Sequence, residues 1–156
     1  MRAKKVVFLA TAEPIDDEMR AKIARHRQER PGDWTTVEAP IELNAAVTEH
    51  GPGASLILID CLTTFATNLL MLEGEDHAAI FARVDRLCNA VRASHASVVI
   101  VSNELGSGIV PSFPLGRQFR DLLGEINQRV AKISDNVVLM VAGCPLLVKG
   151  SLEVQP

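Results

Sequence analysis

The chain lacks the features that mark secreted, membrane-spanning or metal-binding proteins. Its three cysteines, Cys61, Cys88 and Cys144, are odd in number and have no CxxC spacing, which is typical of reduced thiols rather than of disulfides or a metal site. No apolar run approaches the ~20 residues that span a bilayer, and no signal-peptide cleavage region follows the short apolar segment near the N-terminus. We therefore expect a cytoplasmic protein without a membrane span.

An excess of positive charge is also absent. Lysine and arginine number 16 against 19 aspartates and glutamates, so the net charge is -3 and the pI is about 5.8. Nothing therefore draws the whole chain to nucleic acid, and any anion site must come from a local cluster. The 156 residues, 47% of them hydrophobic, suit one core. We expect a single nucleotide-binding domain over residues 1–150 and a loose tail over residues 151–156.

Four short runs rich in β-branched residues indicate buried parallel strands. They are "KVVFLATA", "SLILIDCL", "SVVIVSNEL" and "NVVLMVAG". Segments with helical spacing lie between them, at about 16–27, 43–50, 76–93 and 115–133. This alternation predicts an α/β fold with three layers, in which helices cover both faces of a mostly parallel sheet. Ligands of such sheets bind beyond the carboxyl ends of the strands, where the sequence places Thr11, Asp60, Asn103 and Glu104.

The most concentrated positive charge is "RHRQER", residues 25–30. Met19, Ile23 and His26 follow i, i+4, i+7 spacing, which puts the imidazole on the inward face of its helix. Basic groups near a helix C-terminus are favoured by the helix dipole, so His26 could simply pack there. The alternative is chemical: an imidazole can attack phosphorus, and guanidinium groups can hold the phosphate oxygens.

Two further segments carry polar groups at strand ends. Asp60 ends an apolar strand, as do carboxylates that position Mg²⁺ in nucleotide enzymes, although an aspartate there also serves as the cap of a helix beginning near Thr63. Gly106 and Gly108 permit either exposed backbone amides or a plain turn. The "GIVPSFPLG" run after them has two prolines, and we expect a semi-rigid lid.

Together these segments resemble a known family, the bifunctional adenosylcobinamide kinase/adenosylcobinamide-phosphate guanylyltransferases of cobalamin biosynthesis. The resemblance covers "VVFLATAEPIDDEMRAKIARHRQERPGDWTTVEAP", "LILIDCLTTFATNLL", "VIVSNELGSGIVP" and "GRQFRDLLGEINQRVA", with the specific runs H-R-x-x-R-P-x-x-W and NE-x-G-x-GIVP. It implies a RecA-like P-loop fold, usually a homotrimer. It also implies phosphorylation of the adenosylcobinamide hydroxyl, with ATP as donor, and then transfer of GMP from GTP to adenosylcobinamide phosphate.

The resemblance also implies roles for single residues. His26 matches the family's histidine that carries GMP covalently, and Asp60 matches a position that holds Mg²⁺. The positions at which the family contacts guanine nucleotide or its metal are Ala10, Thr11, Ala12, Arg27, Gln28, Glu29, Arg30, Glu38 and Asp60.

One family element is missing from the sequence, namely the first strand with its phosphate loop. No GxxxxGK[ST] occurs in the chain, and the amides and lysine of that loop hold the β and γ phosphates. The chain as printed is therefore expected to lack kinase chemistry and to bind GTP poorly. Either it is part of a full enzyme, or it is a non-catalytic relative or subunit. Without the central strand, strand edges and an apolar sheet face should be uncovered.

Overall fold

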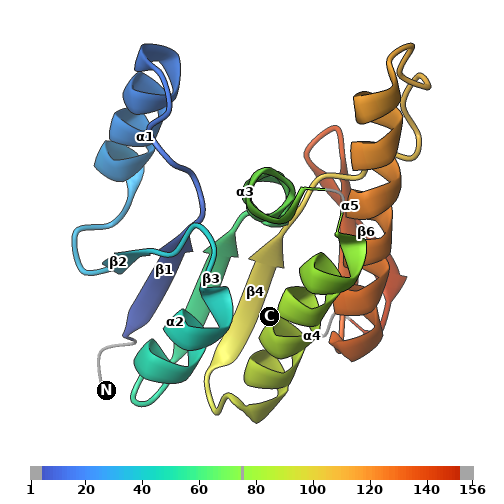
Figure 1. Ribbon diagram of the computed structural model, residues 1–156. Helices are drawn as coiled ribbons and strands as arrows, with labels where there is room; N and C mark the ends of the chain where they lie inside the picture. Colours follow the sequence, from blue (N-terminus) through green and yellow to red (C-terminus); the bar gives the residue numbers. More distant parts are fainter. Residues whose placement is uncertain (1–4, 75, 152–156) are drawn as a thin grey trace.

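The computed structural model describes residues 5–74 and 76–151 (Figure 1). Residues 152–156 of the expected tail lie outside the described part. The elements in chain order are β1 (Val6–Ala10), α1 (Asp17–Glu29), β2 (Thr35–Glu38), α2 (Leu43–His50), β3 (Leu56–Asp60), α3 (Leu62–Glu73), α4 (His77–Ala93), β4 (Ser97–Val101), α5 (Pro114–Ile133), β5 (Val137–Val141) and β6 (Cys144–Lys149).

The main sheet has four strands in the order β2-β1-β3-β4, and each neighbouring pair is parallel. The expected α/β fold, a parallel sheet flanked by helices, is confirmed. Because all four strands run the same way, their last residues meet at one border, which we call the carboxyl edge. In Figure 1 this edge is uppermost, and α1 and the loop before α5 rise beyond it on opposite sides of α3.

The core lies between one face of this sheet and the helices α2, α3, α4 and α5. Alternate residues of the two central strands, Val7, Leu9, Ile57 and Ile59, are at most 1% exposed and belong to a single apolar cluster with the buried side chains of these helices. Fully burying one such aliphatic side chain contributes roughly 1.5–3 kcal/mol. This packing fixes the strands rigidly and so fixes the carboxyl edge.

The expected helices are confirmed to within two residues, and capping explains where two of them begin. The Asp16 carboxylate accepts a hydrogen bond from the Met19 amide at 2.7 Å before α1, and Asp76 accepts from Ala79 at 3.0 Å before α4. Such caps satisfy amides that the first helical turn leaves unpaired. No helix in the described ranges is both long and apolar enough to cross a membrane.

The fourth apolar run is not the buried parallel strand that its composition predicts. Its strand β5 pairs antiparallel with β6 in a separate two-stranded sheet, and most of its residues are exposed. Ala142 and Gly143 join the two strands with φ of 50° and 78°, the left-handed pair of a two-residue hairpin turn. This local turn directs β5 into a hairpin.

Strand β4 is an outer strand of the parallel sheet, with no neighbour beyond it. Val99 and Val101 on its outer face are 47% and 41% exposed. The register aligns Val99 with Leu58 and Phe8, and of these Phe8 is covered by Trp34 and Arg30. The part of this face over β4 is thus open to solvent in the described structure.

Candidate functional site

Thr11 ties the end of β1 to the end of β3. Its hydroxyl is fully buried and lies 3.1 Å from the Asp60 carbonyl oxygen and 2.9 Å from that of Cys61, and it accepts from the Cys61 amide at 2.8 Å. The Thr11 amide also donates to the Asp60 carbonyl at 3.1 Å. Buried polar groups are expensive unless paired, so this cluster sets the backbone that presents the Asp60 side chain.

Asn68 of α3 adds a second tie on the same border. Its side-chain amide donates to the Thr11 carbonyl at 2.8 Å and to the Pro40 carbonyl at 3.0 Å. The loop after β1 and the loop after β2 are therefore held by one side chain. Nothing in the sequence pattern pointed to this residue, because its position in α3 reveals no partner until the two loops are placed.

Helix α1 carries the arginine cluster and lies outside the core, since none of its residues is buried. Met19, Ile23 and His26 are its half-buried residues, and every other position in the helix is exposed. The expected inward face is confirmed. His26 itself makes no hydrogen bond with any described residue, so its ring is held by the position of the helix rather than by a partner of its own.

Two arginines attach the end of α1 to the sheet. Arg27 donates to the Glu38 carboxylate at 2.6 Å, and Arg30 donates to the Thr36 hydroxyl at 3.3 Å. The Arg30 guanidinium also lies 3.6 Å from the centre of the Phe8 ring, a cation–π contact. The pKa of Arg30 is lowered, mainly because the guanidinium is partly buried. The nearby Asp60 carboxylate opposes this shift, and the positive charge of Arg27 adds to it. These contacts attach the C-terminal end of α1, directly after His26, to the strands β1 and β2.

Asp60 does not cap the following helix. The N-cap of α3 is Cys61, with no side-chain cap hydrogen bond, and among the described residues no donor binds the Asp60 carboxylate. The peptide bond between Asp60 and Cys61 is cis. A half-buried carboxylate with both oxygens available, next to a guanidinium, has the donor type that Mg²⁺ prefers.

The glycine-containing loop after β4 is fastened to the same edge. The Asn103 amide and side chain both donate to the Thr63 hydroxyl, at 3.2 and 2.9 Å, and Asn127 of α5 donates to the Asn103 carbonyl at 2.9 Å. The Glu104 carboxylate accepts from the Gly106 amide at 2.6 Å. Thr63 and Asn127 were not expected from the sequence. Whether the loop moves as a lid stays a prediction.

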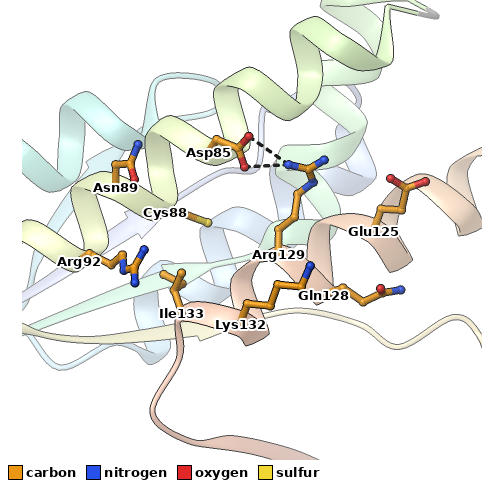
Figure 2. A pocket seen from close by; sticks show the side chains of 9 residues that line it. All are labelled: Asp85, Cys88, Asn89, Arg92, Glu125, Gln128, Arg129, Lys132 and Ile133. Atoms are coloured by element: carbon orange, nitrogen blue, oxygen red, sulfur yellow. Dashed lines mark hydrogen bonds and ion pairs between the residues drawn. The ribbon is translucent and has the colours of Figure 1, made fainter.

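A groove of about 490 Å³ lies away from this edge, between α4 and α5 (Figure 2). Most of the charged side chains that line this groove have a structural role within the protein. Arg129 binds both oxygens of Asp85, at 2.9 and 3.0 Å, and lies 4.3 Å from the centre of the Phe81 ring. Arg92 and Lys132 stand in the last turns of their helices, where the dipole favours cations. No residue expected at the nucleotide site lines it.

Comparison with known families shows which family the chain belongs to. A family model described as cobinamide kinase / cobinamide phosphate guanyltransferase matches residues 1–148. The chain belongs to this family. The resemblance inferred from the sequence motifs is therefore confirmed, and the two activities of the family are those expected from them.

Curated relatives in this cobinamide kinase family match over most of the chain. The bifunctional adenosylcobalamin biosynthesis protein CobU of Salmonella typhimurium is 40% identical, over 94% of this chain and 87% of its own length. CobU of Escherichia coli is 37% identical over the same shares. CobP of Pseudomonas aeruginosa is 35% identical, over 93% of this chain and 83% of its own.

The structure brings some expected family positions together and leaves others apart. Arg27 meets Glu38, Arg30 lies within the field of Asp60, and Thr11 binds the backbone of Asp60. Ala10 ends β1 and Ala12 follows in its loop, both half-buried, whereas Gln28 and Glu29 are exposed on the last turn of α1 with no bond to the other members. Within the described ranges, no group of three or more His, Cys, Asp or Glu side chains that could hold a metal ion occurs.

Proposed function

We propose that this chain transfers GMP from GTP to adenosylcobinamide phosphate through a guanylylated His26, and that with a phosphate loop it also phosphorylates adenosylcobinamide from ATP. One observation carries the proposal: the inward-facing His26 is followed, at the end of α1, by two arginines, of which Arg27 is bound to Glu38 and Arg30 interacts electrostatically with Asp60, and both acids end strands of a parallel sheet. Guanidinium groups suit phosphate oxygens, and the edge is where such sheets bind nucleotides.

The transfer has two balanced steps. A ring nitrogen of His26 attacks the α phosphorus of GTP, a nitrogen–phosphorus bond forms, and the bond to the β phosphate breaks with pyrophosphate leaving. The phosphate of adenosylcobinamide phosphate then attacks the same phosphorus, and the electron pair of the broken bond returns to the imidazole. Arg27 and Arg30 would offset the charge that develops on the phosphate oxygens in both steps.

Asp60 is the residue that would hold Mg²⁺. Its carboxylate accepts no hydrogen bond from the described residues, while Thr11 fixes its backbone, so the donor is both available and positioned. A bound Mg²⁺ supplies charge neutralisation at the phosphates.

The kinase half of the proposal depends on a loop that the printed sequence does not contain. Positioning of a triphosphate contributes as much as ~7–11 kcal/mol to lowering a barrier, and in P-loop enzymes the loop amides and lysine provide much of it.

The homotrimer and the cytoplasmic location stay predictions, which sedimentation and cell fractionation would check.

Labelling with α-³²P GTP tests the proposal. The chain as printed should take up little label, and a protein extended upstream by about 20–25 residues that carry the phosphate loop should take up clear acid-labile label. His26→Ala in the extended protein should abolish the label and leave phosphorylation of adenosylcobinamide largely intact, because a hydroxyl attacks the γ phosphate of ATP directly.

His50→Ala is the matched control, since this half-buried histidine lies at the end of α2 and pairs only with Glu49. Its label should equal that of the parent. Persistent label in folded His26→Ala protein would remove this histidine from the mechanism. An extended protein that binds GTP but never becomes labelled would favour the second candidate, a non-catalytic member of the family.

A further inference from the structure

Four apolar side chains are exposed to solvent on the loop between β4 and α5 and in the first turn of α5. Ile109 is 97% exposed, and Val110, Phe113 and Leu115 are each at least 58% exposed. We call these four residues the apolar loop. Single exposed apolar residues are ordinary, but several in one short segment mark a surface that meets a partner or ligand.

The apolar loop is held in shape, so its exposure is not that of a loose segment. The Arg117 guanidinium donates to the Pro111 carbonyl at 3.0 Å and to the Ser112 carbonyl at 2.9 Å. At Gly116 a Cβ would lie 2.7 Å from both the Phe113 ring and the Pro111 side chain, so the loop folds closely onto the first turn of α5. A surface fixed before binding loses little freedom on binding.

The position of the apolar loop limits which kind of ligand could bind to it. It rises beyond the carboxyl edge across α3 from α1 (Figure 1), and Asn103 at its base is bonded to Thr63 in the first turn of α3, directly after Asp60. A nucleotide is a poor match for this apolar surface, because it presents mainly charged phosphates and polar base edges. The other substrate of the proposed reaction is a corrin macrocycle, which has broad methylated faces and amide arms.

We propose that the apolar loop binds the methylated face of the corrinoid substrate and so sets which molecule is presented to Asp60 and His26. This rests on the proposed function for the identity of the ligand. Ser107, Ser112 and Gln118 beside the loop supply hydroxyl and amide groups that match the amide arms of the macrocycle. Arg117 is then a positioning residue that acts through the backbone carbonyls it binds.

Equilibrium dialysis with dicyanocobinamide, followed by its visible absorbance, tests the proposal on the chain itself. The double variant Ile109→Ser, Val110→Ser should bind about tenfold or more weakly, because each loses apolar area buried against the ring. Its unfolding temperature should not change, since both side chains are exposed in the free protein. Met71→Ser is the matched control: Met71 is 83% exposed on α3, and its loss should leave dialysis unchanged.

Three outcomes would overturn the proposal. They are no cobinamide binding by the parent, equal binding by parent and double variant, and a shift of the variant to a smaller species in sedimentation with unchanged cobinamide binding, which would make the apolar loop an interface between copies. GMP labelling needs only GTP, so it separates the two ideas. In the extended protein that carries the phosphate loop, label together with unchanged cobinamide binding in the variant contradicts the apolar-loop proposal alone, whereas loop-dependent binding without label contradicts the proposed GMP transfer alone.

Discussion

Replacing Thr11 by valine tests whether the tie between β1 and β3 is the structural basis of the site. Valine has nearly the same shape, so the variant removes the hydroxyl without opening a cavity. It leaves the Cys61 amide, which donates to that hydroxyl at 2.8 Å, without a partner and deletes one donated bond to the Asp60 or Cys61 carbonyl. An unpaired buried donor costs about 1–3 kcal/mol and a net hydrogen bond about 0.5–1.5 kcal/mol.

Together these contributions lower the free energy of unfolding by about 1.5–4.5 kcal/mol. At roughly 2–4 °C for each kcal/mol in a chain of this size, the Tm should fall by on the order of 10 °C in a thermal scan followed by far-UV circular dichroism. Thr11→Ser, which keeps the hydroxyl, should lose less than half as much. Thr48→Val removes an exposed hydroxyl bonded only within its own helix and should change Tm little. A Thr11→Val protein as stable as Thr48→Val would refute the reasoning.

Three further predictions concern charge and thiols. Asp60→Asn in a protein that carries the phosphate loop should lower GMP transfer far more than unfolding free energy, because it removes charge but little volume; equal rates at saturating Mg²⁺ would contradict the metal role. Glu38→Gln breaks an exposed pair with Arg27 worth ~0–1 kcal/mol of stability, so label uptake should fall with almost no change in Tm, and unchanged uptake would show that this pair does not position the helix. Burial raises the pKa of Cys88, so at pH 8 alkylation measured by mass spectrometry should reach exposed Cys144 first, and equal rates would contradict the burial.

The parts of the fold that follow from local patterns were predictable from the sequence. Spacing of apolar residues located α2 and α4, the latter to within one residue of its observed start at His77. The inward face of α1 followed from the same 3.6-residue period, which put His26 on the side that the structure finds half-buried. Topology then brought Thr11 and Asp60 together, because the carboxyl ends of parallel strands meet at one edge.

The hairpin of β5 and β6 shows where composition misleads. A run of five apolar residues, Val137–Val141, reads as a strand buried on both faces, yet its residues are mostly exposed. Which partner a strand finds depends on distant segments and on the turn that follows it, here Ala142 and Gly143. Short β2 was missed for a related reason, since Thr35–Glu38 is too polar to stand out before its pairing with β1 is known.

The side chains that assemble the site escaped sequence reasoning more completely. Asn68, Thr63 and Asn127 act by reaching across to backbone groups or hydroxyls 24 to 57 positions away. An asparagine on a helix has no local signature of such a bond, because the acceptor exists only once two loops have been placed. Polar residues of this kind become visible only in three dimensions, while a strand end or an arginine cluster is visible at once.

The two residues proposed to act in the transfer, Asp60 and His26, are held in place in different ways, and this difference affects the chemistry. Asp60 ends a strand whose Ile57 and Ile59 are fully buried, and its backbone is bonded to Thr11, so its position is coupled to the core. His26 sits on a helix without a buried residue, attached by an exposed ion pair at Arg27 and by Arg30 stacked on Phe8. Elements with few buried contacts open at lower free energy than the core. The alignment of nucleophile and phosphate therefore depends more on these two arginines than on the sheet, and their loss should reduce transfer before it reduces stability.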